Sequence, residues 1–173
     1  MEIIILAGGL GTRLKGISGD VPKPMIEINQ KPFLQRLLDS ISKYNISRVV
    51  ISIHYNADYF IKHLDCEAYP FEIKFVVDDK LYGTGGAIKK SLTHCVTRDA
   101  VVLNGDTFTN LNLEDFYAFH LMKNCVVTMS ALKMSNFSRY GSLKVDSDSR
   151  VTSFEEKKFV EKGFINAGCY VVN

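Results

Sequence analysis

The sequence contains little cysteine, no tryptophan and no dense grouping of metal-binding residues. Its two nearest cysteines are 29 positions apart, so no CxxC pair exists for zinc binding or disulfide exchange. No HExxH or HxxxH pattern occurs, and we interpret the scattered histidines as packing or surface residues. Without a disulfide framework, the cysteines are expected to be reduced and buried. The residues concerned are Cys66, Cys95, Cys125, Cys169, His54, His63, His94 and His120.

The chain also lacks an excess of charge of one sign, and it lacks a long apolar run. Lys and Arg number 21 against 19 Asp and Glu, which gives a net charge of +2. This balance excludes a strong electrostatic footprint for nucleic acid or for an anionic membrane. The apolar run Ile3–Ala7 is too short to cross a membrane and has no signal-peptide flank. We therefore expect a cytoplasmic protein with neither a nucleic-acid nor a membrane partner.

What the sequence does contain is a globular composition with alternating strand and helix patterns. Its 173 residues, 46% of them hydrophobic, suffice for one domain with a substantial core. The alternation predicts an α/β fold with a mostly parallel, mixed central sheet and helices on both faces. Strands are expected at 2–6, 49–53, 73–77, 100–103, 125–132, 142–145, 151–155 and 164–172, and helices at 32–44, 57–64, 83–93 and 113–122.

The loop after the first expected strand carries glycines and cations. Gly8, Gly9 and Gly11 lack Cβ atoms, so backbone N–H groups there can close on a polyphosphate. Arg13 and Lys23 add positive charge to the same loop. A Gly-Gly pair alone would favour a simple tight turn, but together with these cations it favours phosphate binding.

Two named nucleotide motifs can be tested against the glycines. A Walker A loop needs Gly, four residues and then Gly-Lys-Ser/Thr, and neither glycine cluster of the chain fits. A dinucleotide-binding fingerprint needs a third glycine at the positions where Leu14 and Ile88 stand. The sequence excludes both motifs as written, which disfavours a dinucleotide-dependent oxidoreductase.

A second polar segment, Asn104-Gly105-Asp106, directly follows an expected buried strand. Ligands of such sheets bind at the carboxyl ends of the strands, so this segment and the glycine loop are expected to line one crevice. A carboxylate in that place is suited to hold Mg²⁺ through its oxygens. The alternative is a plain Asn-Gly-Asp turn, but opposite an anion-binding loop metal binding is favoured.

Polar residues also end or interrupt the late apolar strands. They form the segments Arg139-Tyr140-Gly141, Phe154-Glu155-Glu156-Lys157 and Asn166-Ala167-Gly168. A charged triplet is usually a solvated face. Because these residues stand where apolar strands end, we expect them at the rim of the site.

Taken in order, these motifs resemble those of the sugar-1-phosphate nucleotidyltransferases. The match runs along the whole chain and includes Pro22-Lys23-Pro24 and Gly83-Thr84-Gly85-Gly86-Ala87. The chain is most similar to guanylyltransferases of D-glycero-D-manno-heptose 1-phosphate, with mannose-1-phosphate guanylyltransferases and glucose-1-phosphate thymidylyltransferases as near neighbours. The resemblance implies a Rossmann-like fold. It also implies a reaction of an NTP, here GTP, with a sugar 1-phosphate, here of a heptose, that gives an NDP-sugar for surface polysaccharide and pyrophosphate.

The resemblance further implies a role for each motif. Arg13 would neutralise the leaving pyrophosphate, Lys23 the phosphates at the reacting centre, and Asp106 would be the catalytic ligand of Mg²⁺. A sugar phosphate is largely dianionic at neutral pH, so the reaction needs charge cancellation and positioning rather than a general base. The implied nucleotide-binding residues are Leu6, Ala7, Gly8, Gly9, Gly11, Thr12, Gly83, Thr84, Gly85 and Gly86, and the implied sugar-phosphate-binding residues are Asn104, Tyr140, Gly141, Glu156, Lys157 and Asn166.

One further function class stays open. A non-catalytic sugar-nucleotide-binding or regulatory module would share the fold, although intact Arg13, Lys23, Asp106 and Lys157 favour catalysis. Relatives carry a second metal-binding Asp on a later strand, followed by helices. The resemblance therefore implies that residues 1–173 are a single nucleotidyltransferase domain truncated at its C-terminus. The base, the sugar and the oligomeric state, including a homo-oligomer, stay open at this point.

Overall fold

The computed structural model describes residues 1–9, 19 and 21–173, so the predicted site residues Gly11, Thr12 and Arg13 lie outside the described residues. Within the described part, eight strands form one mixed sheet and two short strands form a separate hairpin. The strands are β1 (Glu2–Leu6), β2 (Glu27–Ile28), β3 (Lys31–Pro32), β4 (Arg48–Ile53), β5 (Glu72–Val77), β6 (Ala100–Asn104), β7 (Val127–Phe137), β8 (Ser142–Val145), β9 (Val151–Glu155) and β10 (Val160–Val172). The helices are the 3₁₀ turn η1 (Lys23–Met25), α2 (Phe33–Ile41), α3 (Ala57–His63), α4 (Gly83–Leu92) and α5 (Leu113–Lys123).

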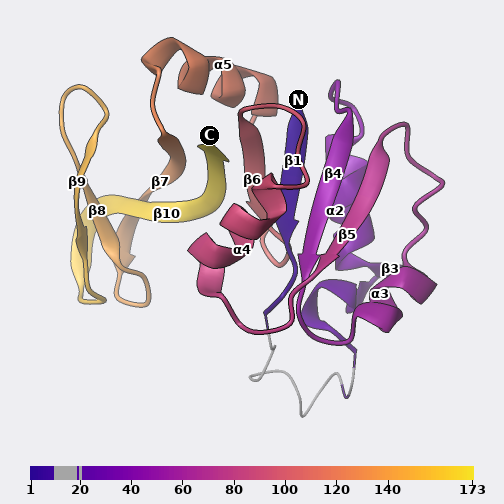
Figure 1. Ribbon diagram of the computed structural model, residues 1–173. Coiled ribbons are helices and arrows are strands. Elements are labelled where there is room, and N and C mark those ends of the chain that lie inside the picture. The colour runs from indigo at the N-terminus through magenta and orange to yellow at the C-terminus, as the bar shows by residue number, and fades with distance from the viewer. Residues whose placement is uncertain (10–18, 20) are drawn as a thin grey trace.

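The sheet joins a parallel half to an antiparallel half. Strands β5, β4, β1 and β6 are neighbours in that order and run parallel. Strand β10 extends this sheet in the antiparallel sense, with Cys169 opposite Leu103 of β6. Its other half pairs with β8, which pairs with β9, while β7 pairs with β10 along both halves (Figure 1). The predicted mixed α/β sheet is thus confirmed.

Helices cover both faces of the parallel half, as predicted. Ile3 and Ile5 of β1 pack on one face against α2, α3 and α5, and Ile4 packs on the other face with Ile88 and Leu92 of α4. In Figure 1, α4 crosses in front of the sheet and α2 lies behind it. Successive residues of a strand point to opposite faces, which explains why a strand covered on both sides reads as a continuous apolar run.

A buried carboxylate anchors the amino ends of the parallel strands. Glu2 is 1% exposed, and its Oε2 accepts hydrogen bonds from the backbone N–H groups of Val96 (2.7 Å) and Thr97 (2.6 Å) and from the Thr97 hydroxyl (2.6 Å). Arg48 Nη1 lies 3.3 Å from Glu2 Oε1, and the same guanidinium pairs with Glu72. Glu2 therefore ties β1 to β4 and to the loop that precedes β6.

Three features differ from the sequence predictions. The hairpin β2–β3 and the turn η1 were not predicted, because two- and three-residue elements carry no periodicity. Strands β7 and β10 extend beyond 125–132 and 164–172, since they pair with each other over most of their length. The four cysteines are free, but the expectation that all are buried is wrong: Cys125 is exposed in the turn between α5 and β7, and Cys169 is buried.

Candidate active site

A crevice of about 370 Å³ opens at the carboxyl ends of the parallel strands. This is the edge of the sheet where the sequence predicted a ligand site. Polar and small residues line much of it, and they come from the ends of all four parallel strands and from the start of α4. The predicted site residues that line it are Leu6, Ala7, Gly8, Gly9, Gly83, Thr84, Asn104 and Asp106.

Two glycines let neighbouring loops approach each other at this edge. A Cβ on Gly105 would lie 2.8 Å from the carbonyl oxygen of Leu6, and one on Gly8 would lie 3.3 Å from the backbone nitrogen of His54. The Gly105 N–H donates to the same Leu6 carbonyl at 2.9 Å. The glycine at position 105 is therefore needed to hold the Asn104-Gly105-Asp106 corner against the end of β1.

Lys23 and Asp106 form an ion pair at one end of the crevice. Lys23 Nζ, on η1, lies 2.6 Å from Asp106 Oδ2, and Thr107 Oγ1 donates to Oδ1 at 3.1 Å. Partial burial of Asp106 opposes its ionisation, but the hydrogen bond and the charge of Lys23 outweigh it, so the pKa of the Asp106 carboxyl lies below its usual value. The structure thus brings together two predicted residues that are 83 positions apart in the chain.

The start of α4 forms the opposite lip of the crevice. Gly83, with φ of +69°, begins this helix after Tyr82, and a Cβ on Gly86 would lie 2.5 Å from the Tyr82 Cβ. Gly83 and Thr84 line the crevice, whereas Gly85 and Gly86 are not among its lining residues.

Sequence reasoning missed a polar group at the ends of β4 and β5. Ser52, His54 and Asp78 line the crevice, and Lys90 of α4 lies 3.1 Å from Asp78 Oδ1. Each is a single residue outside any motif. The one usable signal was position: His54 directly follows the buried strand β4, and Asp78 directly follows the partly exposed strand β5. His120 fits the predicted packing role, because it is 1% exposed and bonded to Thr128 at 2.7 Å.

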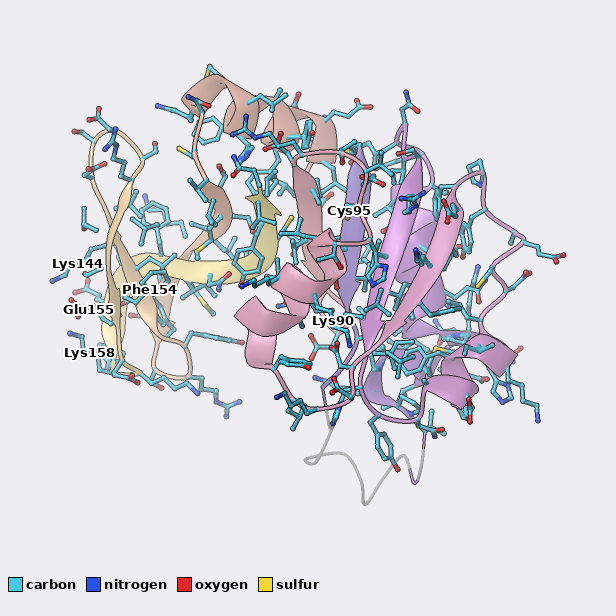
Figure 2. All side chains as sticks on the ribbon, in the orientation of Figure 1. Lys90, Cys95, Lys144, Phe154, Glu155 and Lys158 are labelled. Atoms are coloured by element: carbon cyan, nitrogen blue, oxygen red, sulfur yellow. The ribbon has the colours of Figure 1, made fainter. Side chains whose placement is uncertain are left out.

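The predicted sugar-phosphate residues of the antiparallel half do not line the crevice. Gly141 lies against the β8–β9 hairpin, where a Cβ would be 2.7 Å from the Glu155 carbonyl oxygen, and this brings Tyr140 and Gly141 near Glu156. Lys144 and Lys158 both bind the Glu155 carboxylate and lower its pKa to about 2 (Figure 2). For Tyr140, Gly141, Glu156, Lys157 and Asn166, a role in sugar binding stays a prediction.

Gly168 provides a test of how β10 supports the crevice. Its φ is +77°, and a Cβ there would lie 2.5 Å from Nδ2 of the crevice residue Asn104. Gly168→Ala is expected to lower the free energy of unfolding by about 1–3 kcal/mol, because the new methyl is strained and displaces Asn104. Gly85→Ala, in a helix with open space around it, should instead raise it by about 0.5–1 kcal/mol. Urea unfolding of both variants tests this, and equal stabilities would contradict it.

No described helix is long and apolar enough to span a membrane. No cluster of three or more His, Cys, Asp or Glu suited to a metal ion occurs among the described residues.

Comparisons with known proteins identify the family of the chain. Residues 2–173 match the family model described as nucleotidyl transferase. The chain is 40% identical over 172 residues to the D-glycero-alpha-D-manno-heptose 1-phosphate guanylyltransferase of Campylobacter jejuni, covering 99% of this chain and 76% of the relative. It is 31% identical to the mannose-1-phosphate guanylyltransferase of Mycobacterium tuberculosis, covering 99% of this chain and 48% of that protein.

Solved structures are similar as well. The crystal structure of HddC from Yersinia pseudotuberculosis superposes with a TM-score of 0.88 at 38% identity, covering 99% of this chain and 76% of HddC. A second structure of HddC, complexed with GMP-PN, gives a TM-score of 0.87.

Proposed function

Because the chain belongs to the nucleotidyl transferase family, we propose that it transfers a guanylyl group from GTP to a heptose 1-phosphate and releases pyrophosphate. The observation that carries this proposal is that Asp106, paired with Lys23, lines the same crevice as Gly8 and Gly9. This pair supplies a cation and a carboxylate at the place where a polyphosphate can bind. The guanine base and the heptose follow from the names of the relatives and from the GMP-PN complex of HddC.

The residues act in this proposal through charge and position. The phosphate oxygen of the sugar 1-phosphate attacks the α-phosphorus of GTP, and the bond to pyrophosphate breaks in line with it. The backbone of Gly8 and Gly9 would hold phosphate oxygens. When the substrates bind, Lys23 would exchange its ion pair with Asp106 for contacts to the reacting phosphates and neutralise their charge. Asp106, whose carboxylate is 39% exposed and ionised by its surroundings, would hold Mg²⁺. The ion would neutralise charge developing on the phosphates.

A substrate panel tests the proposal. The purified chain is incubated with each of four NTPs and with heptose, mannose or glucose 1-phosphate, and pyrophosphate and NDP-sugar are measured. We expect the fastest release with GTP and heptose 1-phosphate, and loss of activity on chelation of divalent metal that Mg²⁺ restores. Absence of release with every NTP, or release that does not require a sugar phosphate, would contradict the proposal.

A further inference from the structure

The crevice has two chemically different ends. Asp106 follows β6, His54 follows β4 and Asp78 follows β5, while the glycine loop follows β1 between β6 and β4. Neighbouring strands are about 4.8 Å apart, so the Asp106 and His54 ends are separated by roughly 10 Å. A nucleotide whose phosphates lie at the Lys23–Asp106 end therefore extends its base toward β4 and β5. This step rests on the proposed function, because that function assigns the phosphates to Asp106.

The imidazole of His54 is held in one tautomer at the β4 end. Its Nδ1 lies 3.0 Å from the backbone carbonyl oxygen of Asp78. A carbonyl can only accept a hydrogen bond, so Nδ1 carries the proton. In the neutral imidazole the other nitrogen, Nε2, is then a hydrogen-bond acceptor. No residue in the described part of the chain is bonded to Nε2, which leaves this acceptor for a ligand in the crevice.

The buried carboxylate of Asp78 lies beside His54 and is held in place by Ser52 and Lys90. The Asp78 side chain is 6% exposed, and its Oδ2 accepts a hydrogen bond from Ser52 at 3.1 Å. Its Oδ1 accepts no well-aligned hydrogen bond from the described residues, although Lys90 Nζ lies 3.1 Å away. Lys90, labelled on α4 in Figure 2, is itself held by the Val77 carbonyl at 2.9 Å. The lysine compensates the charge of Asp78, so the carboxylate beside His54 is not an unpaired negative charge.

We propose that His54 determines base specificity, with Nε2 accepting a hydrogen bond from the Watson–Crick edge of guanine. Guanine presents two adjacent donors on that edge, the N1–H and the 2-amino group, whereas adenine presents an acceptor at N1 and a C–H at C2. A pocket that accepts hydrogen bonds rejects a base that lacks the donor, because its polar groups then stay unpaired. His54 thus acts on the choice of NTP rather than on the chemical step.

The test uses two substitutions that distinguish the roles of the two ring nitrogens of His54. His54→Asn keeps an amide near Nδ1, which can still bond the Asp78 carbonyl, but removes the acceptor at Nε2. His54→Gln places an amide oxygen near Nε2. His63→Asn is the matched control, because His63 is exposed on α3, contacts the Tyr59 ring in a tilted arrangement and does not line the crevice. Steady-state kinetics with GTP, ATP and 2′-deoxy-GTP are measured for all four proteins.

We expect His54→Asn to raise the KM for GTP about tenfold with kcat nearly unchanged, and to lower the preference for GTP over ATP by the same factor. His54→Gln should recover part of the loss, and His63→Asn should behave as wild type. If His54→Asn raised the KM for GTP and for ATP by the same factor, Nε2 would contact the ribose rather than the base. The same assignment would follow if the substitution did not change the KM for 2′-deoxy-GTP, and either result would overturn the proposal.

A direct binding measurement separates this inference from the proposed function. Calorimetric titration with a non-hydrolysable GTP analogue reports binding without turnover. If the wild-type chain binds it and His54→Asn binds it about tenfold more weakly, the inference holds even if no sugar nucleotide is formed. Equal binding by both proteins, or no binding by the wild type, overturns the inference.

Discussion

Asp106→Asn is expected to lower the turnover of GTP and sugar 1-phosphate by about 100-fold or more. The substitution keeps the size of the side chain but removes the charge that would hold Mg²⁺ and that pairs with Lys23 at 2.6 Å. Loss of a positioned charge in a phosphoryl-transfer site typically removes about 3–4 kcal/mol of transition-state stabilisation. The measurement is pyrophosphate release at saturating substrate over a range of Mg²⁺ concentrations.

Stability measurements separate this loss of activity from a loss of folding. Both members of the Lys23–Asp106 pair are about 40% exposed, so breaking it should change the free energy of unfolding by less than about 1 kcal/mol. Asp148→Asn is the matched control, since Asp148 is exposed in the turn between β8 and β9. Turnover within a few-fold of wild type in Asp106→Asn would remove Asp106 from the catalytic site.

The parallel half of the fold could be predicted because its elements carry local signals. Ile3, Ile4 and Ile5 are all fully buried, and a β-branched run that ends at glycines indicates such a strand. Helix α2 likewise buries residues at helical spacing, namely Leu34, Leu37, Leu38 and Ile41. Each of these elements is specified within a dozen residues of sequence, which is why their bounds agree with the prediction to within a few residues.

The arrangement of the antiparallel half could not be predicted, because it depends on contacts between distant residues. Cys169 pairs with Leu103, and Ile165 pairs with Leu132. The register break between Asn166 and Tyr170 turns β10 from one half of the sheet to the other. Apolar spacing locates a strand but does not identify its neighbours.

The site residues also divide into those with a local sequence signal and those that depend on contacts in the folded chain. Lys23 and Asp106 stood in recognisable motifs. The carboxyl end of β6 places Asp106 in the crevice, where Lys23 of η1 pairs with it. His54 and Asp78 are single residues whose importance arises from the hydrogen bond between Nδ1 and a backbone carbonyl. No spacing in the sequence encodes that bond. Isolated polar residues directly after the strands of a parallel sheet are therefore worth considering as site residues even without a motif.

Glu2→Ala is expected to lower the free energy of unfolding by about 3–5 kcal/mol. The substitution leaves the backbone N–H groups of Val96 and Thr97 without their acceptor, and it leaves the Arg48 guanidinium facing a cavity. Glu2 lies at the amino ends of the strands, opposite the crevice. The substitution should therefore lower the free energy of unfolding but leave the kcat and KM of the folded protein nearly unchanged. Urea unfolding at pH 7 measures it.

The same carboxylate predicts how stability depends on pH. Burial alone would raise the pKa of Glu2, but the hydrogen bonds from Thr97 and Val96 and the charge of Arg48 outweigh burial and hold its pKa below the ordinary value of 4.5. A lowered folded-state pKa stabilises the fold fully above pH 4.5, and this stabilisation is lost as the pH falls through the folded pKa. Wild type should therefore lose more stability than Glu2→Gln between pH 5 and pH 3, and Glu67→Gln, at an exposed site, should follow wild type. Parallel pH profiles for wild type and Glu2→Gln would show that Glu2 is not the group that links proton binding to unfolding in this range.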